Sequence, residues 1–122
     1  MYTECMAFRF RNFKVYQEAK FLHKEIVILT NKFPRQYWYL IDQLRRSSLS
    51  IILNIAEGSS KQSDKDFNRY IAIALGSVDE TAASLEIALD LELISLEQFK
   101  EFESRLEILS RQLGGFSKFL KT

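Results

Sequence analysis

The chain has 122 residues, of which 47% are apolar and 27% are charged, and its formal net charge is +1. This globular balance fits one compact domain, and no apolar run approaches the roughly 20 residues that span a bilayer, so we expect no signal peptide and no membrane contact. Cys5 is the only cysteine, which excludes an intramolecular disulfide and a Cys-x-x-Cys metal site and favours the cytoplasm.

The first predicted helix covers residues 12–33. Apolar residues alternate at spacings of four and three from Val15 to Phe33, which is the seam of a helix in a bundle. Pro34 is the only proline and ends this helix, because the residue before a proline is pushed out of helical geometry.

The second predicted helix covers residues 36–58 and ends at Gly58 as a left-handed C-cap. From Leu49 to Ala56 its apolar arc is about 200° wide, and about 100° suffices for a surface helix. Small or uncharged polar groups fill the other side, so we expect a packed polar seam beside a subunit interface; a solvated outer face is the alternative. The residues predicted to specify packing or the interface, including a small-residue stretch on the third helix, are Gln43, Ser50, Asn54, Glu57, Gly58, Gly76, Ser77 and Glu80.

The third and fourth predicted helices both begin with capping signals. Ser63 caps a helix over residues 64–93, with acidic residues in its first turn where the helix dipole favours them. Ser95 and Gln98 form a complete capping box for a helix over residues 96–121. No strand pattern competes, so four helices joined by short connections predict one all-α domain, an antiparallel up-down-up-down four-helix bundle.

Charge is unevenly distributed between the two halves of the chain. Residues 1–61 hold ten Lys/Arg and five Asp/Glu, and residues 62–122 hold seven and eleven, so the halves carry +5 and −4. One interpretation is that the halves attract each other in the bundle. The other is a basic surface for phosphates, with the candidates Arg9, Arg11, Lys14, Arg45, Arg46 and Lys61.

Motifs for catalysis or metal binding are missing from the sequence. His23 is the only histidine, and Lys20 occupies the position of the glutamate in a Glu-x-x-His di-metal motif, so no metal or other cofactor is predicted. No nucleophile triad assembles, so no catalytic residue is predicted; a hydrolase using Glu57 and Glu80 is the alternative. The aromatic residues 37–39 could stack on bases, but such a cluster more often caps the end of a core.

Three segments in one order, FKVYQEA (13–19), FP (33–34) and QLRRSSLSIILNIAEGSSKQSDKDFNRYIAIALGSVDE (43–80), resemble the four-helix-bundle family named after the 23S ribosomal RNA intervening sequences. The resemblance runs over nearly the whole chain. It implies a ring-shaped homopentamer and no established enzymatic reaction. A related branch, the accessory variability determinant of diversity-generating retroelements, is a basic pentamer that works with nucleic acid, and this chain departs from it in its near-neutral charge.

These observations predict a cytoplasmic, non-enzymatic homo-oligomer, by resemblance a pentamer. We expect it to associate with RNA or DNA, ribosomal RNA first, or with an RNA-processing partner, through its basic first half. The alternative is a protein-interaction scaffold that binds no nucleic acid. Salt dependence separates the two, because binding to phosphates weakens steeply as salt is added.

Overall fold

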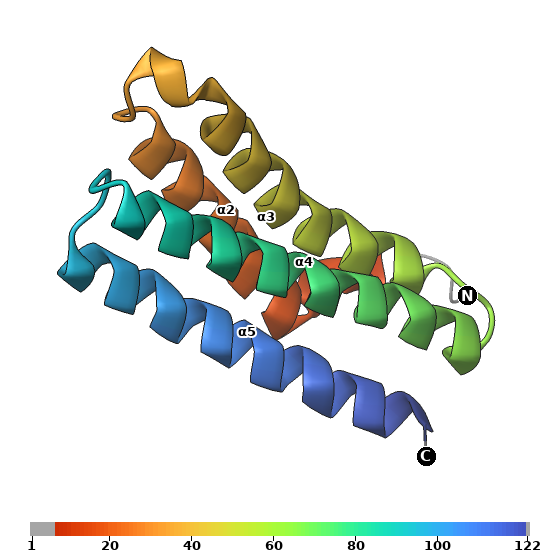
Figure 1. Ribbon diagram of the computed structural model, residues 1–122. Coiled ribbons are helices and arrows are strands. Elements are labelled where there is room, and N and C mark those ends of the chain that lie inside the picture. The colour runs from red at the N-terminus through yellow and green to blue at the C-terminus, as the bar shows by residue number, and fades with distance from the viewer. Residues whose placement is uncertain (1–6, 122) are drawn as a thin grey trace.

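A computed structural model describes residues 7–121, and within that range every long element is an α-helix and none is a strand. The four long helices lie side by side in Figure 1, each running opposite to the one before it. The predicted all-α class is therefore confirmed. Cys5 lies outside the described residues. The elements in chain order are η1 (Arg9–Asn12), α2 (Lys14–Thr30), η2 (Arg35–Tyr37), α3 (Trp38–Ser59), α4 (Asp64–Asp90) and α5 (Leu96–Lys121).

The helix α2 stops at Thr30, three residues before the predicted end. Beyond it the amides of Lys32 and Phe33 donate to carbonyls three residues earlier, which tightens the chain into a turn. Pro34 explains this end, because it excludes helical geometry at the residue before it. After the proline, η2 forms one short turn and α3 begins at Trp38, two residues later than predicted.

Gly58 does not end α3 in the way that the sequence predicted. The helix continues through Gly58 to Ser59, and no glycine of the described chain has a positive φ, so the prediction of a left-handed cap is wrong. A Cβ at this position would lie 2.7 Å from Tyr70 Cβ and 3.0 Å from Phe67 Cδ1. Gly58 is thus required because α3 and α4 approach each other closely there.

The predicted caps of α4 and α5 are confirmed. The Asp66 amide donates to Ser63 Oγ over 3.1 Å, and Ser95 and Gln98 exchange both bonds of the capping box at 2.9 and 3.0 Å. These bonds satisfy amides that the helix itself leaves without a partner.

The C-terminal end of α4 comes at Asp90 rather than at residue 93. Glu92 has the left-handed φ of 60°, its amide donates to Leu89 O, and the Leu93 amide reaches back to Ala88 O, both at 2.9 Å. This is the Schellman motif, in which glycine usually holds the left-handed position. Here Glu92 occupies the left-handed position, although its side chain makes a positive φ less favourable than it is for glycine.

The core is built from the predicted apolar seams. Buried side chains of all four helices meet along the bundle axis, among them Leu22, Leu44, Ile71 and Leu109, each at most 1% exposed. Among the adjacent helix pairs, the packing is most extensive between α3 and α4 and sparsest between α2 and α5. Among the described residues no helix combines the length and the apolarity that a membrane span requires.

Candidate nucleic-acid interface

A row of small neutral polar groups joins α3 to α4, and we call Ser47, Ser50, Asn54, Ser77 and Thr81 the neutral seam. Asn54 Nδ2 donates to the Ser50 carbonyl at 2.8 Å and to Ser50 Oγ at 3.0 Å, and Ser50 Oγ lies 2.8 Å from Ser77 Oγ. Thr81 Oγ1 lies 2.8 Å from both Ser47 Oγ and the Ser77 carbonyl. The polar seam expected from the sequence therefore pairs within one chain.

The other predicted packing residues lie outside this seam. Gln43 and Glu80 are exposed and share a shallow surface pocket of about 220 Å³ with Arg46, and Glu80 has no ion pair within the described chain. Gly76 is exposed, and nothing lies within 4 Å of the position that a Cβ would occupy, so it allows no close approach inside this chain. Glu57 is exposed, with its carboxylate 3.9 Å from Lys61 Nζ.

A second and differently built row joins α3 to α2, and we call His23, Thr30, Asn31, Arg45 and Ser48 the charged seam. Arg45 Nε donates to Thr30 Oγ1 at 2.9 Å, and its Nη2 donates to Asn31 Oδ1 at 2.8 Å. His23 Nδ1 lies 2.7 Å from Ser48 Oγ. The guanidinium of Arg45 thus ties the end of α2 to α3.

The short contact between His23 and Ser48 resembles the nucleophile–base pair of a hydrolase, but its setting is structural. Ser48 is fully buried and its hydroxyl lies 3.3 Å from the Arg45 carbonyl, so no substrate reaches it. Burial lowers the pKa of His23 below its ordinary 6.5, and the positive charge of Arg45 lowers it further. His23 is therefore a neutral packing group.

Four of the six predicted phosphate contacts lie at one end of the bundle, and we call Arg9, Arg11, Lys14 and Lys61 the basic end. Arg9 Nε donates to the Ser59 carbonyl at 3.2 Å, which fixes η1 against the end of α3. The Arg9 guanidinium also lies over the ring of Phe67 at 5.5 Å. Arg11 and Lys14 are exposed.

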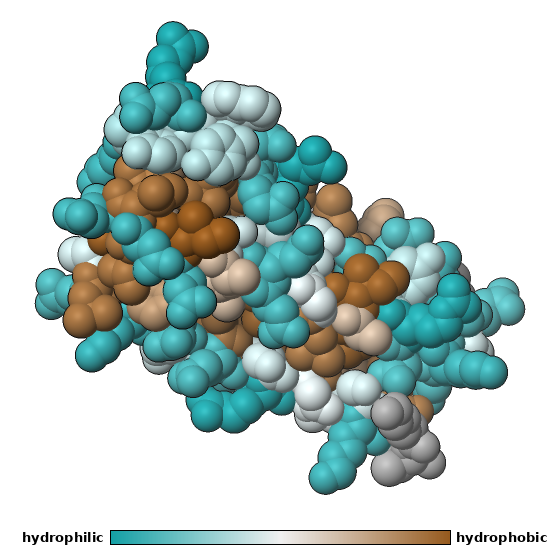
Figure 2. Space-filling model, viewed as in Figure 1, coloured by the Kyte–Doolittle hydropathy of each residue, from teal (hydrophilic) through white to brown (hydrophobic). Residues whose placement is uncertain are grey.

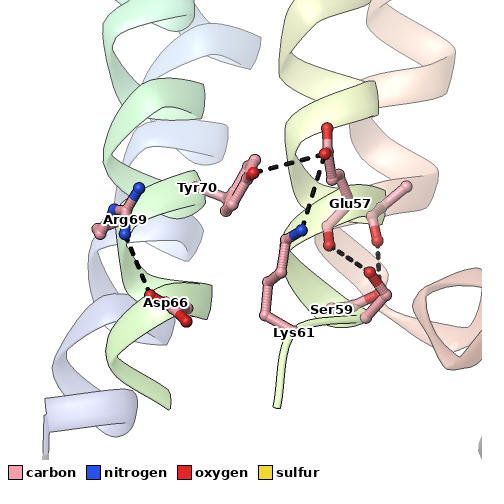
Figure 3. Close-up of polar contacts among 8 residues, drawn as sticks. Glu57, Ser59, Lys61, Asp66, Arg69 and Tyr70 are labelled. Carbon is pink, nitrogen blue, oxygen red and sulfur yellow. Dashed lines mark hydrogen bonds and ion pairs between the residues drawn. The ribbon is translucent and has the colours of Figure 1, made fainter. Parts of the chain in front are cut away.

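Acidic residues border the basic end. Figure 3 shows Lys61 and Tyr70 both directed at Glu57, and Arg69 paired with Asp66 at 3.1 Å. The positive charge of Lys61 is therefore partly compensated. In the part of the chain that the structure describes, Arg9, Arg11 and Lys14 have no carboxylate partner within 4.0 Å.

The other two predicted phosphate contacts lie far from this end. Arg46 sits 13 residues before Ser59, which is about 20 Å along α3. Its side chain is exposed and pairs with Asp42 at 3.6 Å, one turn earlier. Arg45 is half-buried in the charged seam. The six candidates therefore do not form one continuous surface.

Glu57 and Glu80, the acid–base pair of the hydrolase alternative, do not converge. Glu57 contacts Tyr70, and Glu80 lies ten residues further along α4, which is about 15 Å. Within residues 7–121 no group of three His, Cys, Asp or Glu side chains is placed to hold a metal ion.

Large apolar side chains remain exposed on the outer side of α3 and α4. The apolar arc of α3 leaves Leu53 54% exposed, and Ile73 on α4 is 51% exposed. Figure 2 shows such apolar areas interrupting the hydrophilic surface. The aromatic residues at the start of α3 are also exposed. Trp38 and Tyr39 are 68% and 50% exposed, so they do not cap the core.

The sequence reasoning missed Thr81 in the neutral seam and Thr30, Asn31 and Ser48 in the charged seam. A signal for Thr81 was present, because small neutral polar residues recur every three or four positions on facing helices, at 47, 50 and 54 on α3 and at 77, 81 and 84 on α4. Such spacing places polar groups on one helix face, beside the apolar seam.

A sequence model described as "23S rRNA-intervening sequence protein" matches residues 11–115 of the chain. Among solved structures, the chain is similar to a protein of unknown function from the S23 ribosomal protein family of Bacteroides thetaiotaomicron. The two chains are 27% identical with a TM-score of 0.79, over 85% of this chain and 95% of that one. No curated protein is similar enough in sequence to count as a match.

Proposed function

The chain belongs to the 23S rRNA-intervening sequence protein family, and from this membership we propose that it is a non-enzymatic homo-oligomer that associates with RNA through its basic end. Ribosomal RNA is the first candidate, because the family carries its name. An RNA-processing partner that already holds RNA would use the same surface.

The observation that carries this proposal is the trio of uncompensated cations Arg9, Arg11 and Lys14. Arg9 uses Nε to hold η1 in place, and its remaining guanidinium nitrogens have no protein acceptor among the described residues. A guanidinium that is fixed in position but keeps free donors suits bidentate binding of a phosphate. Three neighbouring cations fit a short stretch of RNA backbone.

The assembly in this proposal is a ring, by resemblance a homopentamer. Its physical support is the exposure of large aliphatic side chains on α3 and α4, such as Leu53 and Ile73. Exposed apolar side chains are stabilised when another protein surface covers them. The relationship to the accessory variability determinants of retroelements belongs to the same proposal. The near-neutral charge limits nucleic-acid contact here to a local patch.

Fluorescence anisotropy of labelled ribosomal-RNA fragments, titrated with the full chain at several salt concentrations, tests the proposal. We expect binding with a steep salt dependence, as counterions are released from each neutralised phosphate. The double variant Arg9→Glu/Arg11→Glu should lose it. Lys24→Glu/Lys100→Glu makes the same change of charge at exposed positions elsewhere and should retain it. No binding at low salt would overturn the proposal.

A protein-interaction scaffold is the second candidate, and the exposed Leu53 and Ile73 favour it. In that case the exposed apolar residues of α3 and α4 bind a partner protein. The charged side chains then serve only the packing of the helices against each other. An intact oligomer that binds no RNA at any salt concentration would support this function. Leu53→Asp would then abolish capture of the partner in pull-downs.

A further inference from the structure

A pocket at the start of α3 combines an exposed aromatic ring with two arginines. It measures about 480 Å³ and is lined by Arg35, Trp38, Ile41, Asp42 and Arg45. This volume is in the range of small-molecule sites. It lies at the opposite end of α3 from the basic end, because α3 begins at Trp38 and ends beside Arg9.

Trp38 is the unusual residue of this pocket. A tryptophan normally buries its large ring, yet this one is 68% exposed. Tyr39 meets it edge to face, with ring centroids 6.3 Å apart and an interplanar angle of 89°. An edge-to-face contact with one neighbour covers at most one face of the indole, so this side chain leaves at least one face open for stacking.

The charged groups of the pocket have different degrees of freedom. Arg45 is held by Thr30 and Asn31, so its guanidinium has a fixed position. Arg35 is exposed and free to follow a ligand. The Asp42 carboxylate is paired with Arg46 at 3.6 Å, which leaves the positive charge of the two arginines in excess.

We propose that this pocket binds one unpaired nucleotide of a single-stranded RNA, with the base stacked on Trp38 and its phosphate at Arg35 and Arg45. Stacking on an aromatic ring requires a base that is free of its pair, so a duplex would not be bound here. The Asp42 carboxylate would accept a hydrogen bond from an amino group of the base. This inference rests on the proposed function and names the kind of RNA that it involves.

Trp38 is the only tryptophan of the chain, so its fluorescence reports this pocket alone. The test titrates the full-length oligomer with a short single-stranded oligoadenylate and with an abasic strand of the same length. We expect saturable quenching by the first strand and none by the second. Trp38→Ala should weaken binding of the first strand about tenfold or more in anisotropy, and Trp38→Phe, which keeps an aromatic face, less than threefold. Arg35→Ala should weaken it several-fold.

Two results would overturn the proposal. Equal quenching by the abasic strand would mean that no base stacks on Trp38. The second result is a blue-shifted Trp38 emission that does not change when RNA is added and that shifts to the red on dilution. It would mean that a second copy of the chain covers the pocket.

The basic end is judged separately in the same titrations. If both strands bind in anisotropy, Trp38 does not respond and Arg9→Glu/Arg11→Glu abolishes binding, the basic end stands and the pocket proposal is wrong. If neither strand binds at any salt concentration, both proposals are wrong.

Discussion

The two sides of α3 are both polar, but they hold their neighbours by different means. Toward α4 the groups are hydroxyls and one amide, whose short side chains pair only where the helices come close, and Gly58 permits that approach. Toward α2 the long Arg45 side chain bridges the helices and carries charge. The neutral seam is thus built from short uncharged groups and the charged seam from one long guanidinium, and His23, whose pKa is lowered, lies on the α2 side.

The largest effect is expected where the two helices come closest. Gly58→Ala places a methyl group against Tyr70 Cβ, which cannot turn away because Cβ is fixed to the backbone. Overpacking of this kind costs about 1–3 kcal/mol of the free energy of unfolding, measured by urea denaturation.

Gly76→Ala is the matched control, because nothing lies within 4 Å of its Cβ position. It should stabilise the helix by up to about 1 kcal/mol. Similar destabilisation by both variants would show that α3 and α4 are not closely packed at Gly58.

The next largest effect is expected within the neutral seam. Thr81→Val keeps the shape of the side chain and removes the hydroxyl that pairs with buried Ser47. We expect a loss of about 1–2 kcal/mol in chemical denaturation, because the buried Ser47 hydroxyl loses its partner on α4 and keeps only the Leu44 carbonyl at 3.4 Å.

Thr30→Val makes the same exchange in the charged seam. It should cost less, since the half-buried Arg45 can turn to water. A larger loss at Thr30 would reverse the comparison.

A smaller effect is expected for Arg45→Met, which removes the bridge between α2 and α3. The loss should be about 1 kcal/mol, since Asn31 is exposed and is hydrated when the guanidinium is gone. Arg46→Met removes only an exposed ion pair and should stay within about 0.5 kcal/mol in the same thermal or urea measurement. If both variants behave alike, Arg45 does not tie the two helices together.

The smallest effect is the dependence of stability on pH that His23 confers. Its pKa is lowered in the folded chain by burial and by Arg45, so the unfolded chain takes up the proton first as pH falls below 6.5. Stability is therefore complete above that value and declines until pH passes the folded-state pKa.

Urea titrations between about pH 7.5 and 5.5, above the range where most carboxylates titrate, measure this decline. His23→Gln should flatten it, and Arg45→Met should reduce it because one cause of the lowered pKa is gone. An unchanged slope in His23→Gln would assign the pH dependence to other groups.

Features that depend on a few neighbouring residues were predictable from the sequence. The capping signals at Ser63 and Ser95 placed the starts of α4 and α5 correctly, and the alternating apolar spacing found the buried seams. The effect of Pro34 was also foreseen, although α2 ends three residues earlier than predicted. Each of these signals acts within one or two helical turns.

Features that depend on contacts between helices were not predictable. Gly58 fits a helix end in sequence, but its role is set by Phe67 and Tyr70 on the next helix. The pairing of Arg45 with Thr30 and the exposure of Trp38 also follow from how the helices pack. For the candidate site, the sequence supplied the basic residues, and only the fold divided them into the basic end and the N-terminal half of α3.

The order of helix packing also has a consequence for the folding rate. The most extensive packing joins α3 to α4, which follow each other in the chain, while the first and last long helices, although adjacent in the bundle, have less extensive packing than any adjacent pair that is consecutive in sequence. Contacts that are local in sequence form quickly, because little loop entropy is lost in making them. We therefore expect a fast folder whose transition state already contains the α3–α4 hairpin. Thr81→Val should slow refolding in stopped-flow kinetics, whereas Leu109→Ala on α5 should mainly accelerate unfolding.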